Sequence, residues 1–110
     1  MSKHRNSLEN PNDHHLYQID DLKEKCIFKY GISDDPIDED GLSRRIKRQV
    51  NYLNLVVGYI RFVGEIILRN IAGRKKAKDI EDKYIDDHID LHGFRPRGNP
   101  TGGKKHKPNK

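Results

Sequence analysis

The sequence contains no tryptophan, one methionine and a single cysteine, Cys26. A lone cysteine excludes an internal disulfide and a zinc site built from cysteines, and we expect Cys26 to be a small buried strand residue. No run approaches the ~18 consecutive apolar residues of a membrane-spanning helix. The polar start of the chain also lacks the apolar stretch of a secretory signal. The sequence therefore predicts neither a membrane span nor a signal peptide.

Hydrophobic residues are also scarce, at 33% of 110 residues, against 35% charged residues. A chain of this size has room for one domain, and this composition predicts a small core with polar ends. We expect a flexible lead-in at 1–13, a folded domain at 14–99 and a disordered basic tail at 100–110.

The charges are unevenly distributed along the chain, whose formal net charge is +5. Residues 42–76 hold nine arginines or lysines and one acid, Glu65, whereas acids cluster in 34–40 and 79–90. A basic middle and a basic tail are typical of proteins that bind a phosphate backbone. The alternative is a charged surface that only keeps a small protein soluble.

Apolar periodicity predicts five elements. Two strand-like runs form a hairpin, an acidic loop follows, and a third alternating run lies between two segments of helical period. The expected ranges are strands at 16–19, 26–32 and 59–69, and helices at 42–54 and 74–91. The order is β-β-α-β-α, which predicts an α+β fold with a small three-stranded antiparallel sheet flanked by helices. Gly64 in the third strand indicates a bulge or a close approach.

A carboxylate interrupts the apolar stripe of the second predicted helix. On a helical wheel, Glu81 falls among Ala77, Ile80, Tyr84 and Ile85. A carboxylate near the core is costly unless a cation or hydrogen-bond donors satisfy it. The sequence leaves two explanations: a structural salt bridge with an arginine, or a ligand for a hard divalent ion such as Mg²⁺.

The first predicted helix has a similar feature. Arg45 and Gln49 lie against the stripe that Leu42 and Ile46 define. An inward arginine needs an anionic partner, either a carboxylate or a phosphate. The other cations of this segment are expected to point outward, where they are solvated or contact phosphate: Arg44, Lys47 and Arg48.

Several short motifs occur in an order that resembles the GIY-YIG (URI-type) nuclease superfamily. "HLYQI" stands at its first signature strand, "FKYGIS" at its second, and "RPRGN" near its end. The family's helical arginine, metal-binding glutamate and late asparagine match Arg45, Glu81 and Asn99. The resemblance extends from His14 to Asn99. The segments "RRIKRQVNYLN", "GRKKA" and "GFRPRGN" look like the branch found as toxin domains of bacterial polymorphic toxins.

The chain departs from the family pattern at three places. In the first signature, only Tyr17 remains. In the second, either Lys29 takes the place of the family's tyrosine, or a bulge allows Tyr30 to do so, because alternation directs only one of them to the site. Gln49 stands where the family often has histidine or tyrosine, and glutamine cannot act as a general base.

The resemblance implies a GIY-YIG nuclease-like endonuclease that hydrolyses DNA phosphodiester bonds with Mg²⁺ or Mn²⁺ and low sequence specificity. Glu81 would hold the ion, Arg45 would stabilise phosphoryl charge, and Tyr17 would position or deprotonate the attacking water. The remaining expected site residues complete the hairpin wall or orient Glu81 or the phosphate: Lys29, Tyr30 and Asn99.

Four histidines, two in the hairpin and two in the second helix, raise the alternative of a zinc site. We favour ordinary surface histidines, because a helical pair needs at least a third ligand. His15 remains a candidate proton carrier. The four are His14, His15, His88 and His92.

Outward cations are expected to follow a nucleic-acid backbone without reading its sequence. They are Arg44, Lys47, Arg48, Arg74, Lys75 and Lys76. The toxin resemblance further implies a cognate immunity protein that covers the basic face, and secretion or delivery from the producing bacterium as part of a larger toxin that acts in the target-cell cytoplasm. Two alternatives remain open: a non-catalytic nucleic-acid-binding module, and a nuclease of the same fold that cleaves RNA.

Overall fold

The structure, a computed structural model, describes residues 7–105. Within these residues the elements are β1 (Asp13–Asp21), β2 (Cys26–Ser33), α1 (Arg44–Val57), β3 (Phe62–Ala72) and α2 (Arg74–His92). The strands form one antiparallel sheet in the order β2-β1-β3. The predicted α+β class and the β-β-α-β-α order are confirmed.

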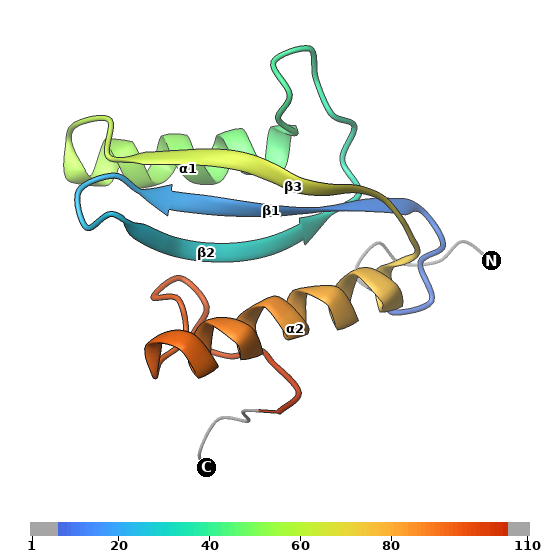
Figure 1. Ribbon diagram of the computed structural model, residues 1–110. Coiled ribbons are helices and arrows are strands. Elements are labelled where there is room, and N and C mark those ends of the chain that lie inside the picture. The colour runs from blue at the N-terminus through green and yellow to red at the C-terminus, as the bar shows by residue number, and fades with distance from the viewer. Residues whose placement is uncertain (1–6, 106–110) are drawn as a thin grey trace.

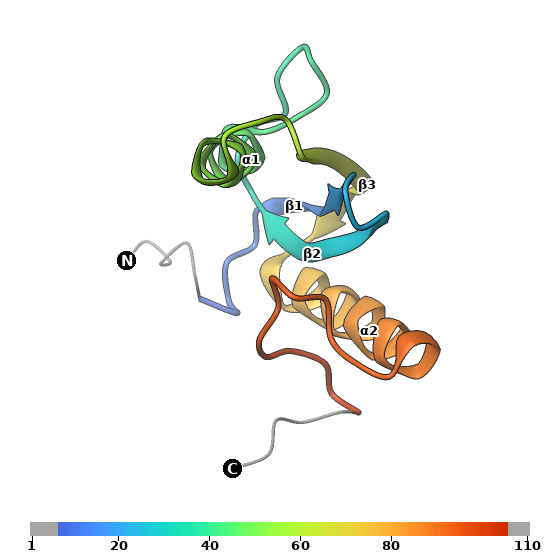
Figure 2. The same cartoon turned by 90° about the vertical axis from the view of Figure 1, so that its left-hand side faces the viewer.

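The sheet lies between the two helices, with α1 on one face and α2 on the other (Figures 1 and 2). Successive residues of a strand point to opposite faces, so β1 supplies both cores: Tyr17 contributes to the α1 side and Leu16 to the α2 side. The buried residues of the α1 side are Tyr17, Ile19, Ile46 and Phe62. Those of the α2 side are Leu16, Ile32, Ile71 and Ala77.

Helix α1 begins later and ends later than the predicted range of 42–54. Ser43 is extended, with φ −93° and ψ 161°, so the helix starts at Arg44. It continues to Val57 and stops at Gly58, whose φ of 84° lies in the left-handed region that glycine adopts easily.

The third strand is displaced from its predicted range of 59–69. The Asn54 side chain accepts hydrogen bonds from the backbone N–H groups of Arg61 and Phe62, at 2.9 and 2.7 Å. This contact ends the turn after α1 and starts β3 at Phe62. Ile60, which lies within the predicted range, precedes the strand and is 77% exposed, so the predicted start of the strand is wrong.

The structure decides the predictions made for two small residues, Gly64 and Cys26. A Cβ at Gly64 would lie 2.5 Å from Cγ2 of Ile46, so glycine allows α1 to pack closely on β3; of the two alternatives, the close approach is the correct one. The prediction for Cys26 is wrong: it is exposed, because it is the first residue of an edge strand beside the hairpin turn.

The segment after α2 returns along that helix. The backbone N–H of Gly103 donates to Asp82 Oδ1 at 3.0 Å, and those of Lys104 and Lys105 donate to Asp86 Oδ2 at the same distance. This part of the tail that we expected to be disordered is therefore held against α2, and 106–110 lie outside the described residues.

The start of the chain shows a similar division. Strand β1 already includes Asp13, the last residue of the lead-in that we expected at 1–13, and Asn10 is buried. Residues 1–6 lie outside the described part of the chain.

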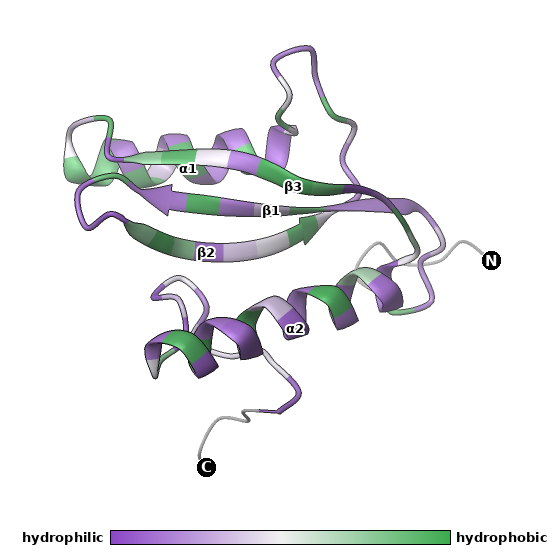
Figure 3. Cartoon of the chain, in the orientation of Figure 1, coloured by the Kyte–Doolittle hydropathy of each residue, from purple (hydrophilic) through white to green (hydrophobic). Residues whose placement is uncertain are grey.

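The hydropathy of α1 changes along its length, from hydrophilic at the first turn to hydrophobic at the last (Figure 3). Its outer face ends in Tyr52, Leu55 and Val56, which are 67%, 80% and 66% exposed. Neither helix within residues 7–105 is long and apolar enough to cross a membrane.

Candidate active site

Regular alternation directs Lys29 and Gly31 of β2 to the face of Tyr17, and a bulge adds Phe28 to that face. The register of β2 with β1 shifts between Ile19 and Asp20, which pair with Lys29 and Ile27, so Phe28 is an extra residue. Such a bulge interrupts the alternation of a strand. Phe28 packs in the α1-side core, and Lys29, although adjacent to it, also reaches α1.

Tyr30 lies on the opposite face of the sheet. Its ring meets Tyr84 of α2 edge to face, with centroids 5.4 Å apart. Burial, followed by the neighbouring Tyr84, raises the pKa of Tyr30. The structure therefore places Lys29, and not Tyr30, on the same side of the sheet as Tyr17.

Tyr17, Gln49 and Lys29 form a hydrogen-bonded chain. Lys29 Nζ donates to Gln49 Oε1 at 2.8 Å, and Gln49 Nε2 donates to Tyr17 Oη at 2.7 Å. Tyr17 is buried, at 1% exposure, and its phenol lies against Gly31 of β2. Lys29 and Gln49 are half-buried, so they connect this phenol to the surface.

The Lys29 ammonium lies within the electrostatic influence of both helices. Burial lowers the pKa of Lys29, the positive charge of Arg45 lowers it further, and the negative charge of Glu81 opposes these effects. Arg45 comes from α1 and Glu81 from α2. The charges of Arg45 and Glu81 therefore act on Lys29 from helices that lie on opposite faces of the sheet (Figures 1 and 2).

The Arg45 side chain is not directed into the core, contrary to our wheel prediction. It is exposed, and the backbone N–H of Arg45 donates to Asp35 Oδ2 at 3.1 Å. Because α1 begins at Arg44, Arg45 belongs to the first helical turn, next to the open acidic loop rather than above the sheet. Its guanidinium is therefore accessible to an external anion.

Glu81 is 8% exposed, in agreement with its predicted place in the apolar stripe. Its Oε1 accepts a hydrogen bond from Lys78 Nζ at 2.7 Å, and the same ammonium lies 3.3 Å from Asp82 Oδ1. Within residues 7–105 no three His, Cys, Asp or Glu side chains gather into a metal-binding cluster. Glu81 would be the residue that holds a divalent ion at this place, and water and substrate would supply the other ligands.

Asn99 lies far along the chain from β2 but pairs with it. Its Oδ1 accepts from the backbone N–H of Tyr30 at 2.8 Å, and its Nδ2 donates to the carbonyl of Tyr30 at 2.9 Å. Gly98 N–H also donates to the carbonyl of Phe28 at 2.7 Å. The segment covers the open edge of β2, and both polar groups of the Asn99 side chain are engaged there rather than with Glu81.

Three of the four histidines are buried, so the expectation of ordinary surface histidines is wrong for them. His15 Nε2 lies 2.9 Å from Ser43 Oγ, and burial lowers the pKa of His15. Backbone carbonyls accept from His14 Nδ1 and His88 Nδ1, at 2.7 and 2.8 Å. His92 is exposed at the end of α2. Tertiary packing covers the other three, which a pattern of single residues does not reveal.

The cations predicted to follow a nucleic-acid backbone differ in their availability. Lys47 is paired with Asp38 at 2.8 Å and with Asp40 at 3.1 Å. Lys75 is paired with Asp79 at 3.3 Å. The others have no ion pair with any described residue, and Arg74 is half-buried while the rest are exposed: Arg44, Arg48, Arg74 and Lys76.

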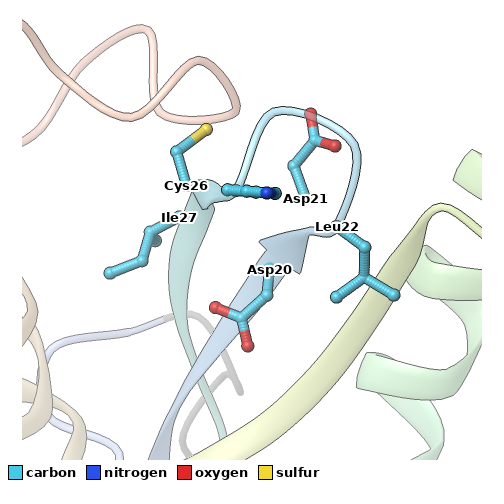
Figure 4. Close-up of a pocket in the computed structure, with 6 residues that line it drawn as sticks. Asp20, Asp21, Leu22, Cys26 and Ile27 are labelled. Carbon is cyan, nitrogen blue, oxygen red and sulfur yellow. The ribbon is translucent and has the colours of Figure 1, made fainter.

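A pocket lies at the far end of the β1–β2 hairpin, away from this cluster (Figure 4). The side chains of Asp20 and Asp21 diverge there (Figure 4). Asp21 is buried and accepts two hydrogen bonds from Arg61, at 2.9 and 2.8 Å, and another from Arg97. These contacts join the hairpin, β3 and the loop after α2, so the role of Asp21 is structural.

Sequence reasoning missed two residues of the site. From the sequence, Gln49 was noted only because glutamine cannot act as a general base. In the structure its side chain forms hydrogen bonds with both Lys29 and Tyr17. Its position against the apolar stripe of α1 was the available signal. Gly31 was treated as part of a signature, but a Cβ at that position would overlap Cζ and Oη of Tyr17.

The fold and this cluster define a small α+β domain with a polar site at the edge of its sheet. The family model described as URI fold toxin 2 matches residues 7–93. Because the match covers most of the chain, the chain belongs to the URI fold toxin 2 family, and it is a nuclease-like toxin domain of the URI type. No match is found among curated proteins or solved structures.

Proposed function

We propose that this toxin domain is a metal-dependent endonuclease of the GIY-YIG superfamily that hydrolyses DNA phosphodiester bonds with low sequence specificity. One observation carries the proposal. Lys29, hydrogen-bonded through Gln49 to Tyr17, lies where the charges of Arg45 and Glu81 both act on it. Tyr17, Gln49 and Lys29 are joined by hydrogen bonds on the α1 side of the sheet, and Arg45 and Glu81 act on Lys29 through their charges.

Glu81 is the residue that fits a divalent ion. Mg²⁺ is usually held by one or two carboxylates together with waters and substrate phosphates, and Glu81 supplies one carboxylate at low exposure. The bound ion would stabilise the negative charge that develops on the phosphoryl group. Lys78 forms ion pairs with both Glu81 and Asp82. The Lys78 ammonium can therefore turn toward Asp82 and leave a Glu81 oxygen available.

The other residues act on the phosphate and on water. The exposed Arg45 guanidinium donates to phosphoryl oxygens as their charge grows. The Lys29 ammonium adds positive charge next to them, and Tyr17 positions the attacking water. Asn99 keeps the loop at 96–99 against β2 and so supports the wall that carries Lys29.

A non-catalytic nucleic-acid-binding module is the principal alternative, and the exposed Arg44 and Arg48 would suit it equally. Phosphate binding needs no buried acid, however, and a buried carboxylate is unfavourable in a surface that binds a polyanion. The burial of Glu81 near Lys29 therefore favours catalysis. The sugar of the substrate has no recognisable determinant here, so RNA is the second alternative substrate.

The toxin context completes the proposal. We infer that the domain is delivered from a producing bacterium within a larger polymorphic toxin and acts in the cytoplasm of the target cell. A cognate immunity protein with acidic residues would cover the face that carries Arg44 and Arg48, since complementary charge speeds association and selects the partner.

The test is cleavage of supercoiled plasmid DNA by the purified domain with Mg²⁺ or Mn²⁺, alongside transfer RNA and an EDTA control. We expect nicked and then linear plasmid with either ion and intact plasmid with EDTA. Binding without cleavage under every divalent ion would support the binding module. Cleavage of the RNA alone would change the substrate but keep the reaction.

A further inference from the structure

The orientation of the Gln49 amide follows from its neighbours. Its side chain lies between Lys29 Nζ, at 2.8 Å, and Tyr17 Oη, at 2.7 Å. A lysine ammonium has only donors. The Gln49 carbonyl must therefore face Lys29, and its amide nitrogen must face Tyr17.

This orientation fixes the direction of the next hydrogen bond. An amide NH₂ group donates and does not accept, so the Tyr17 oxygen is the acceptor toward Gln49. The hydroxyl proton of Tyr17 must then point elsewhere. No described residue accepts a hydrogen bond from it at residues 7–105. Gly31, which leaves room for the end of the phenol, offers no side chain that could accept this proton.

We propose that Gln49 is a positioning residue that makes Tyr17, which is only 1% exposed, a hydrogen-bond donor toward the attacking water rather than an acceptor from it. Lys29 sets the direction through Gln49. Tyr17 then orients the water oxygen through its hydroxyl proton. The identity of the ligand rests on the proposed nuclease function, whereas the direction of the hydroxyl rests only on Lys29 and Gln49.

A purely structural role for Gln49 makes a different prediction. Gln49→Glu preserves the shape of the side chain and strengthens its contact with Lys29, because charge-assisted hydrogen bonds are stronger than neutral ones. It also replaces the donor toward Tyr17 with a carboxylate oxygen, which turns the Tyr17 proton inward. Gln49→Met removes both hydrogen bonds but creates no acceptor. A structural role would make Gln49→Met the more damaging change, and our proposal makes Gln49→Glu the more damaging one for cleavage.

The direction can be measured without activity. With ¹³Cζ-labelled tyrosine in a mixture of H₂O and D₂O, a slowly exchanging hydroxyl gives two resonances and a rapidly exchanging one gives a single resonance. Tyr17→Phe assigns the signal. We expect a single Tyr17 resonance in the wild type and two in Gln49→Glu. The same pattern in both proteins would overturn the proposal.

Plasmid cleavage supplies the second readout. We expect Gln49→Glu to lose at least about tenfold in rate, which corresponds to one hydrogen bond to a charged or reacting group, while its midpoint of thermal unfolding stays equal or rises. Asn51→Asp makes the same charge change at an exposed position of α1 and should cleave like the wild type. Gln49→Glu that cleaves as fast as Asn51→Asp would refute the proposal. A wild type without any cleavage would instead defeat the proposed function, and the exchange measurement would still decide the role of Gln49.

Discussion

The phenol of Tyr17 lies directly over Gly31, and a Cβ added to Gly31 would overlap its Cζ and Oη atoms. Tyr17 and Gly31 are also paired across β1 and β2. A glycine at position 31 is therefore a condition for the hydrogen bond between Tyr17 and Gln49. The pair links the packing of the sheet to the proposed site.

We predict that Gly31→Ala displaces Tyr17 and destabilises the fold by about 1–3 kcal/mol, the usual cost of overpacking. Plasmid cleavage should fall with it. Chemical denaturation measures the stability change. In a Tyr17→Ala background the same glycine change should cost much less, because the overlapping ring is absent. Equal costs in both backgrounds would show that Tyr17 is not the obstacle.

The fold could be predicted from the sequence because its signals are local. Alternation gave the hairpin, and the helical period of Ile46 and Val50 gave α1. Part of the site depended on contacts that no local pattern carries. Alternation directs Lys29 to the face of Tyr17, but its hydrogen bond to Gln49 and the exposure of Arg45 in the first turn of α1 appear only in the structure.

The predictions for the histidines and for the start of β3 were wrong for the same reason, because both features depend on contacts with residues outside the helix or strand concerned. His15 is covered because Ser43, the residue that precedes α1, contacts it from a distant part of the chain. Asn54 sets the first residue of β3 through side-chain hydrogen bonds to the backbone, which periodicity does not register. The burial of Glu81 was predicted correctly because Glu81 lies in the apolar stripe of α2 with Ala77 and Ile85, which are also buried.

Asp21 should be among the most sensitive positions for stability. It is buried, and Arg61 and Arg97 both donate to its carboxylate. We predict that Asp21→Ala costs about 1.5–3 kcal/mol, because it removes charge-assisted hydrogen bonds while the partly exposed guanidinium groups remain in contact with water. Thermal or urea unfolding provides the measurement.

The exposed pair of Asp38 with Lys47 provides the matched control, since Asp38→Ala removes a surface ion pair worth at most about 1 kcal/mol. The Arg61 hydrogen bonds hold the pKa of Asp21 well below its usual range. A carboxyl group whose pKa is depressed by folding stabilises the fold at pH values above its pKa in the unfolded chain. This stabilisation is lost as the pH falls toward the pKa of the folded state. The difference between wild type and Asp21→Ala should therefore shrink in acid. A constant difference would contradict this assignment.

Asp20 should show the opposite dependence on pH. Burial and the neighbouring Glu65 raise the pKa of Asp20 from 3.8 to about 6. A raised pKa means that the fold holds the proton more tightly than the unfolded chain, so stability declines as the pH rises from about 4 through 6. Asp20→Asn should be more stable than the wild type at pH 8 and equal to it at pH 4, as measured by urea unfolding. The same gain at both pH values would contradict the raised pKa.

Nucleic-acid affinity should depend on which cations are free of internal partners. Arg48 has no ion pair with a described residue, whereas Lys47 is paired with Asp38 and Asp40. We predict that Arg48→Ala weakens DNA binding at every sequence and reduces the salt slope of log K by about 1, as expected for one lost phosphate contact. Lys47→Ala should change the slope less. Fluorescence anisotropy at several salt concentrations measures both, and equal slopes for the two variants would contradict this distinction.

The central claim is that Glu81 serves the reaction rather than the fold. Cleavage of supercoiled plasmid with Mg²⁺ by Glu81→Gln and Asp82→Asn, with DNA affinity measured in parallel, tests it most directly. Both carboxylates are buried, lie next to each other on α2 and contact Lys78, and Asp82 also accepts a hydrogen bond from the Gly103 backbone N–H, so Asp82→Asn carries at least the structural cost of Glu81→Gln. The account predicts that Glu81→Gln loses cleavage by about a hundredfold or more (about 2.7 kcal/mol) at unchanged affinity, while Asp82→Asn cleaves nearly as the wild type does. Equal cleavage by the two variants would contradict it.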